Sequence, residues 1–93
     1  MYCLLYDVPS QKRRNQIIRI CKDHGFMRIQ KSCFWGAPSK HMLSRMEGLL
    51  QQIAQPEDCI CLIPVPEAKL KQVKSWGQPL DVSIMEGKNV CFV

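Results

Sequence analysis

The residues best suited to chemistry in this sequence are one acid and a group of bases that follow it closely. Asp7 comes directly after the apolar run 2–6, so we expect its carboxylate at the end of a strand. The basic run 12–14 (Lys-Arg-Arg) falls in the first turn of an expected helix, where each cation opposes the helix dipole at a cost of about 0.3–1 kcal/mol. A bound phosphate would offset this cost, because helix N-termini and basic side chains both attract phosphate oxygens. The alternative interpretation of Asp7 is a side-chain cap of the turn before Pro9.

The positive charge of the chain is concentrated in one segment. The net charge is +5, yet residues 12–31 carry seven cations and one acid, which makes +6, and the remainder carries six cations and seven acids, which makes −1. The seven cations are Lys12, Arg13, Arg14, Arg19, Lys22, Arg28 and Lys31. Such segregation favours a binding surface for a polyanion such as a nucleic acid. A solvated helix face is the alternative interpretation.

The elements that must position these residues follow from apolar periodicity and from capping residues. They are a strand at 2–6, a helix between Ser10 and Gly25, a β segment at 26–35 formed as one bent strand or two, a helix from Ser39 to Ile53, an apolar strand at 59–65 that is expected at the centre of the sheet, a short helix at 67–76 with Leu70 and Val73 inward, and β-prone runs at 80–85 and 89–93. This order predicts an α+β sandwich with helices on one face of an antiparallel sheet. Its economical form is the ferredoxin-like βαββαβ fold with an additional C-terminal β segment.

With 93 residues, the chain suits a single compact domain. We assign residues 1–78 to the ferredoxin-like domain and residues 79–93 to a C-terminal strand extension for dimer or partner contacts. No apolar run reaches the ~18–20 residues of a membrane span, and the N-terminus lacks the basic region of a secretory signal. The expectation is a cytoplasmic protein with no membrane partner.

The six cysteines are interpreted as reduced and structural, because nothing in the sequence indicates export to an oxidising compartment. Most of them lie within apolar runs, where a thiol behaves as a small hydrophobic group. Cys59 and Cys61 form a C-x-C pair, but the sequence offers it no second C-x-x-C and no histidine cluster. The zinc signal is therefore weak.

Three linked motifs resemble the small CRISPR-associated adaptation nuclease, the Cas-two (Cas2) family. They are the opening run 1–8 with its Tyr-Asp pair, the basic run 12–15, and the alternating run 28–36. The match in register covers roughly residues 1–65. The resemblance implies a ferredoxin-like homodimer that works in spacer acquisition beside the CRISPR integrase subunit (Cas-one). It also implies a magnesium-dependent endonuclease that cleaves RNA or double-stranded DNA.

The resemblance carries residue roles with it. It implies that Asp7 is the metal ligand. Mg²⁺ prefers oxygen ligands, and one carboxylate is a poor site for it. We therefore expect two Asp7 side chains to share one ion across a two-fold axis. The implied catalytic residues are Asp7, Tyr6, Arg14, Arg28 and Phe34. The expected nucleic-acid-binding residues are Lys12, Arg13, Arg14, Arg28, Lys31 and Ser32. A second helix-start arginine of some relatives falls on Gln16 here, so that role is absent or passes to Arg13.

Three functions are compatible with these features. The first is a metal-dependent phosphodiesterase. The second is a non-catalytic scaffold, a basic dimer that binds duplex DNA by its backbone and bridges integrase subunits. The third, an RNA-recognition module, is disfavoured because the aromatic signature of its central strands is missing.

Overall fold

The computed structural model of the chain describes residues 1–77. The elements are β1 (Tyr2–Asp7), α1 (Gln11–Asp23), β2 (Met27–Gln30), β3 (Cys33–Gly36), α2 (Lys40–Ile53), β4 (Cys59–Pro64) and the 3-10 helix η1 (Glu67–Gln72). The β-prone runs expected at 80–85 and 89–93, and with them the extension assigned to 79–93, lie outside the described residues.

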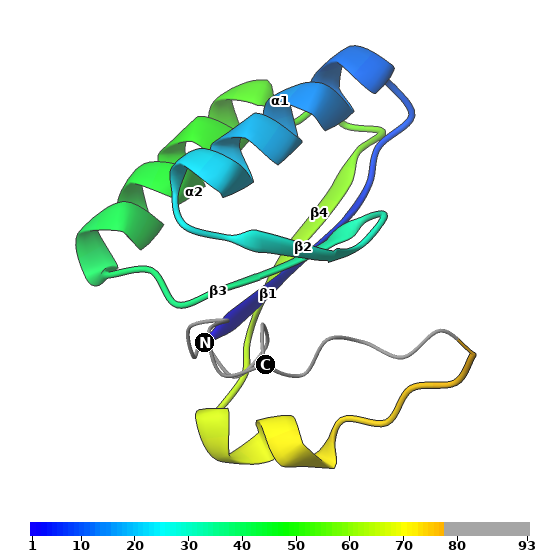
Figure 1. Cartoon of the computed structure of the whole chain (residues 1–93). Helices are drawn as coiled ribbons and strands as arrows, with labels where there is room; N and C mark the ends of the chain where they lie inside the picture. The colour runs from blue at the N-terminus through cyan, green and yellow to red at the C-terminus, as the bar shows by residue number, and fades with distance from the viewer. Residues whose placement is uncertain (78–93) are drawn as a thin grey trace.

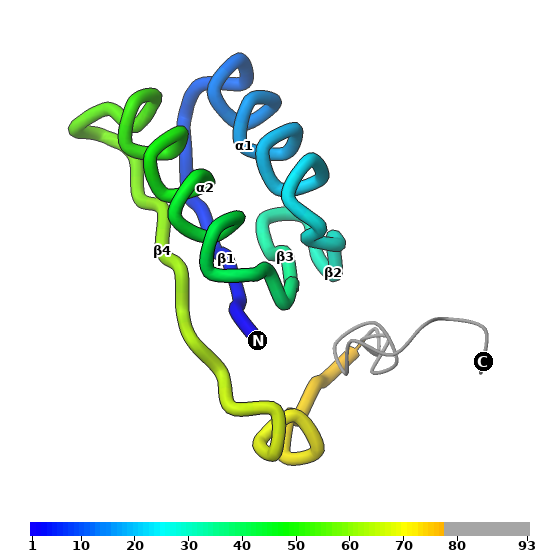
Figure 2. The backbone as a smooth tube through the Cα atoms, turned by 90° about the vertical axis from the view of Figure 1, so that its left-hand side faces the viewer, coloured from blue at the N-terminus to red at the C-terminus, as the bar shows by residue number. Residues whose placement is uncertain are grey.

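The four strands form one antiparallel sheet in the order β2-β3-β1-β4 (Figure 1). Helices α1 and α2 lie side by side on the same face of this sheet, as Figures 1 and 2 both show. This arrangement confirms the predicted α+β fold of the ferredoxin-like type. None of the helices among residues 1–77 has the length and apolar character needed to cross a bilayer.

Local sequence signals account for both helices. The Ser10 and Ser39 hydroxyls each accept a hydrogen bond of 3.2 Å from a backbone N–H in the first turn, those of Arg13 and Met42, which is the expected N-cap geometry. Gly25, just after α1, has a φ of +81°, a conformation that glycine adopts without a steric penalty. Both predicted caps and the predicted stop are confirmed.

The segment 26–35 forms two strands, which settles the alternative that the sequence left open. Strands β2 and β3 pair as a hairpin whose turn contains Lys31 and Ser32. The register shifts between Arg28 and Gln30, so one extra residue on β2 interrupts the regular alternation of side chains. The single alternation expected from the sequence therefore does not continue through the hairpin.

The predicted central position of the strand at 59–65 is wrong for the sheet that the structure describes, because β4 lies at its edge next to β1. The continuous apolar run was misleading because its two faces meet different surroundings. Ile60 and Leu62 pack against the helix-side core, whereas Cys59, Cys61 and Ile63 are exposed on the other side. The apolar composition of a strand indicates that at least one of its faces is covered, but it does not indicate whether the strand pairs with one neighbouring strand or with two.

The two faces of the sheet contribute to separate clusters. The larger core fills the space under the helices, and its fully buried members are Leu4, Ile17, Cys21, Phe34 and Met46. On the opposite face a smaller cluster joins Cys3, Cys33 and Trp35 to Leu70 of η1. Leu70 is inward as predicted, but Val73 is 40% exposed because η1 ends at Gln72.

Candidate active site

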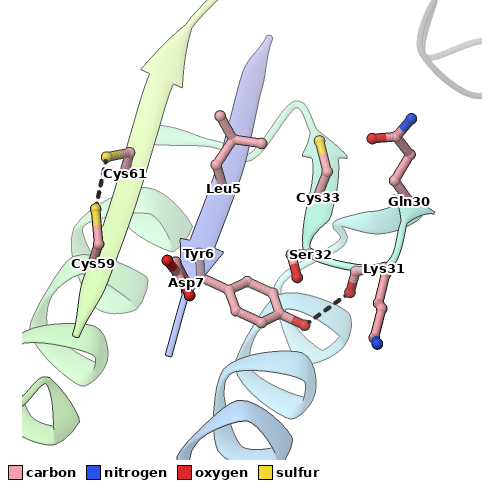
Figure 3. Close-up of a pocket in the computed structure, with 9 residues that line it drawn as sticks. All are labelled: Leu5, Tyr6, Asp7, Gln30, Lys31, Ser32, Cys33, Cys59 and Cys61. Atoms are coloured by element: carbon pink, nitrogen blue, oxygen red, sulfur yellow. Dashed lines mark hydrogen bonds between the residues drawn. The ribbon is translucent and has the colours of Figure 1, made fainter. Parts of the chain in front are cut away.

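Asp7 is the last residue of β1 and its side chain is exposed. Successive residues of a strand point to opposite faces. Leu4 and Tyr6 therefore face the helices, while Leu5 and Asp7 face the open side, beside Cys61 and Cys59 of β4. A hollow of about 530 Å³ lies on this open face, and Asp7 is one of the residues that line it (Figure 3).

A second hollow, of about 310 Å³, collects most of the predicted basic residues. Five of the expected site residues line it: Tyr6, Arg14, Arg28, Lys31 and Ser32. Three of these, Tyr6, Lys31 and Ser32, also line the hollow that contains Asp7. The acid and the bases are thus on adjoining surfaces, although they come from β1, α1 and the β2–β3 hairpin.

The β2–β3 turn is held in place by two of the predicted catalytic residues. The backbone carbonyl of Lys31 accepts hydrogen bonds from the Tyr6 hydroxyl at 3.1 Å and from Arg28 Nη2 at 2.8 Å (Figure 3 shows the first). The Arg28 guanidinium carbon also lies 5.6 Å from the ring centroid of Phe34, a cation–π distance. Tyr6 and Arg28 therefore position the turn, and with it Lys31 and Ser32.

Phe34, which the resemblance implies as a catalytic residue, lies in the core under the helices. Its side chain is 0% exposed, and its ring centroid lies 6.4 Å from that of Tyr6, with 28° between the ring planes. A residue without exposed surface cannot touch a nucleic acid. Phe34 instead supports the two residues of the site that it contacts, Tyr6 and Arg28.

Arg14 holds the loop that follows Asp7. Its Nη1 donates hydrogen bonds to the backbone carbonyls of Val8 at 2.7 Å and Pro9 at 2.9 Å. Because these carbonyls belong to the loop between Asp7 and α1, the hydrogen bonds from Arg14 fix the position of Asp7 relative to the helix. Its guanidinium is only partly buried and it borders the basic hollow.

Arg13 is placed differently from its neighbour. It forms an ion pair with Asp58 at 2.7 Å through Nε and with Glu57 at 2.9 Å through Nη2, and a third bond of 2.9 Å joins Nη2 to the second Asp58 oxygen. The hydrogen bond from Arg13 lowers the pKa of Asp58 below its ordinary value of 3.8. These acids, unforeseen from the sequence, compete with phosphate for Arg13. Two of the three cations in the first turn of α1 thus have partners within the fold.

The surroundings of Asp7 on β4 were not predicted from the sequence. Cys59 and Cys61 are exposed, with their Sγ atoms 3.8 Å apart, so they are not the interior cysteines that the apolar run indicated. The contact with Cys61 and, more weakly, the charge of Asp7 raise the pKa of Cys59 above 9.0. Their i, i+2 spacing in an expected strand was the available signal, since it places both thiols on one face.

Asp7 has few candidate metal ligands around it. Within residues 1–77, no three His, Cys, Asp or Glu side chains converge closely enough to hold a metal ion. The described residues therefore provide no complete set of protein ligands around Asp7, and a magnesium ion there would take further ligands from water, from substrate or from a second chain.

Comparison with known proteins decides the family. The sequence profile of the family described as CRISPR associated protein Cas2 matches residues 1–73. The chain belongs to the Cas2 family. Curated Cas2 relatives include a protein of Synechocystis named CRISPR-associated endoribonuclease Cas2 3, which is 31% identical over 85% of this chain and 86% of its own length. A second, from Korarchaeum cryptofilum, is named CRISPR-associated endoribonuclease Cas2 and is 33% identical over 81% of this chain and 82% of its own.

Solved structures agree with this assignment at the level of the fold. The crystal structure of Streptococcus pyogenes Cas2 superposes with a TM-score of 0.71 at 23% identity, over 82% of this chain and 98% of that one. A hypothetical protein from Thermus thermophilus, TT1823, superposes with a TM-score of 0.65 at 24% identity, over 70% of this chain and 79% of that one. The ferredoxin-like fold predicted from the sequence is therefore also that of a Cas2 crystal structure.

Proposed function

We propose that this Cas2 chain is a metal-dependent endonuclease of the CRISPR system that cleaves phosphodiester bonds in RNA, with double-stranded DNA as the other substrate to test. The observation that carries the proposal is the exposed Asp7 on a surface adjoining the hollow of Arg14, Arg28 and Lys31. An acid beside a basic surface suits a cation-assisted reaction on a polyanion. The names of the curated relatives, CRISPR-associated endoribonucleases, support the same activity.

The proposed active form is a homodimer that pairs through the open face of the sheet. Leu5 and Ile63 are 40% and 41% exposed on this face, and apolar side chains grouped on an uncovered sheet favour a protein partner. Pairing two copies would bring a second Asp7 to the site, so that two carboxylates share one Mg²⁺. Mg²⁺ is commonly held by one or two carboxylates together with substrate phosphates, and Asp7 fits that donor set. When bound, the ion would supply a Lewis acid for the scissile phosphate and for water.

The residues of the chain itself have distinct tasks in this proposal. Lys31 and the guanidinium edges of Arg14 and Arg28 neutralise phosphates on either side of the cleaved bond. Ser32, half-buried in the same turn, offers a hydroxyl to a phosphate oxygen. Tyr6 donates its hydroxyl proton to the Lys31 carbonyl, so its task is to keep the turn in place. Lys12, exposed at the start of α1, adds to the attraction of the backbone.

The test of catalysis is cleavage of RNA and duplex DNA by the wild type and by Asp7→Asn, with Mg²⁺ and with a chelator. We expect the substitution to lower the cleavage rate by at least about 100-fold, because it removes the anionic ligand. Asp23→Asn, which changes an exposed acid in the last turn of α1, is the matched control and should cleave as the wild type does. Equal cleavage by Asp7→Asn would remove Asp7 from the mechanism.

A non-catalytic scaffold is the second candidate, favoured because no three potential metal ligands converge among residues 1–77. In that case the basic hollow alone is essential, and the chain bridges integrase subunits on duplex DNA. Arg14→Gln should then weaken duplex binding and flatten its salt dependence by about one unit of slope. Arg13→Gln is the matched neighbour, and it should leave the salt slope nearly unchanged, because Arg13 is already paired with acids. Loss of spacer acquisition with Arg14→Gln but not with Asp7→Asn would favour the scaffold.

A further inference from the structure

Cys59 and Cys61 differ from the other cysteines of the described residues because both are exposed, whereas Cys3, Cys21 and Cys33 are buried. Their Sγ atoms lie 3.8 Å apart on the open face of β4 (Figure 3). Two sulfur ligands of one tetrahedral Zn²⁺, each about 2.3 Å from the metal, also lie about 3.8 Å apart. The two thiols therefore have the spacing of two ligands to one thiophilic ion.

The surroundings of this pair favour a cation. Cys59 is the cross-strand partner of Asp7, and Cys61 is the partner of Leu5. Both thiols line the hollow of about 530 Å³ that also contains Asp7. A metal ion bound there would neutralise two thiolates beside a carboxylate, and coordination deprotonates a thiol outright. Thiolate ligands select zinc over magnesium, which takes oxygen ligands.

One chain supplies only part of such a site, because no third ligand within residues 1–77 converges on the pair. Structural zinc sites close their tetrahedron with four ligands, and four cysteines are a common set. Two chains paired through their open faces would provide four thiols. We propose that Cys59 and Cys61 of two chains together bind one thiophilic divalent cation, Zn²⁺, which ties the two sheets together. This inference rests on the homodimer of the proposed function, and it adds a site of different chemistry beside Asp7.

The test begins with the full chain, freed of metal by a chelator and kept reduced by a phosphine. Titration with Co²⁺, the spectroscopic substitute for zinc, should produce a thiolate-to-cobalt charge-transfer band that saturates at about one ion per two chains. Added Zn²⁺ should abolish the band, and an excess of Mg²⁺ should not. Native mass spectrometry of the wild type with Zn²⁺ gives the same stoichiometry without any variant.

The variant that tests the assignment is Cys59→Ser/Cys61→Ser, in which the band should be lost. Both side chains are exposed, and circular dichroism checks that the fold is retained. Cys91→Ser, at a cysteine outside the described residues, is the matched control and should keep the band. A band that survives the double substitution, or that saturates at one ion per chain, overturns the proposal.

Two independent measurements separate this inference from the proposed function. Sedimentation of the metal-free chain shows whether it is a dimer. RNA cleavage by the wild type and by Asp7→Asn in Mg²⁺ shows whether the chain is a nuclease that depends on Asp7. A dimer that cleaves RNA but gives no cobalt band overturns the zinc site alone. A chain that remains monomeric with and without Zn²⁺ overturns the zinc site together with the dimer. Cobalt binding at the predicted stoichiometry with no cleavage leaves the zinc site standing and removes the nuclease.

Discussion

The two faces of the sheet are built from the same strands, yet they differ in what covers them. On the helix side, α1 and α2 exclude solvent from Leu4 and Phe34, which are both 0% exposed. On the other side, Leu70 of η1 packs against a smaller buried cluster of Cys3, Cys33 and Trp35, and Leu5 remains 40% exposed among residues 1–77. The first face holds the fold together by burial of apolar area. The second face carries the carboxylate of Asp7, two exposed thiols and the exposed apolar side chains of Leu5 and Ile63.

This difference shows that identical residues one position apart can have separate tasks. Leu4 and Leu5 are adjacent leucines in β1, and only the direction of each side chain distinguishes them. We therefore expect substitutions on the helix side to change stability. Substitutions on the open side should change assembly and ligand binding.

The largest expected effect is the loss of stability in Leu4→Ala. Removing a fully buried leucine side chain should lower the free energy of unfolding by about 2–5 kcal/mol, because a cavity remains under the helices. Leu5→Ala is the matched control, and it should lower this free energy by less than about 1 kcal/mol in the monomer. Urea denaturation at a dilution where the chain sediments as a monomer measures both. Similar losses in the two variants would contradict the distinction between the faces.

An intermediate effect is expected for Gly36→Ala in β3. A Cβ there would lie 2.7 Å from ring atoms of Phe26, which is itself only 3% exposed and has little room to move. The free energy of unfolding should fall by about 1–3 kcal/mol through overpacking.

The control for Gly36 is Gly48→Ala in α2, where an added Cβ meets no atom within 4 Å. This substitution should raise the free energy of unfolding by about 0.5–1 kcal/mol, because alanine favours the helix. Thermal or urea denaturation of both variants should therefore give shifts of opposite sign. Stabilisation by both substitutions would show that the core under the helices is not tightly packed around Phe26.

At neutral pH the smallest effect is expected from the ionisation of the buried thiol of Cys21 on α1, which should influence stability only at alkaline pH. Burial raises the pKa of Cys21 from 9.0 to about 12, so above pH 9.0 the unfolded chain loses this proton while the folded chain keeps it. The free energy of unfolding should therefore decrease as pH rises, by roughly 1 kcal/mol per pH unit from this group. Cys21→Ala should remove that part of the slope, as measured by urea denaturation across this pH range. Below about pH 8 the difference in the free energy of unfolding between the wild type and Cys21→Ala should be independent of pH. If this free energy falls with pH above 9.0 as steeply in Cys21→Ala as in the wild type, the pH dependence does not come from Cys21.

The sequence was sufficient for features that depend on neighbouring residues. Ser10 and Ser39 cap their helices through hydrogen bonds to residues three positions away, and Gly25 ends the first helix through its own φ. The position of Asp7 at the end of a strand is local in the same sense. By contrast, the edge position of β4 in the sheet formed by residues 1–77 could not be inferred, because strand order depends on pairing between distant segments.

The sequence by itself determined where β1, α1, α2 and β4 lie, the charge of the 12–31 segment and the family to which the motifs point, because all of these depend on residue type and short spacing. The tertiary structure decided which of those residues act together. It joined Tyr6 to the carbonyl of Lys31, 25 positions away, and it paired Arg13 with Asp58, 45 positions away, while leaving Arg14 beside the basic hollow. It also brought Cys59 next to Asp7. Such contacts form only when the packing of distant segments fixes their relative positions, and no local pattern encodes them.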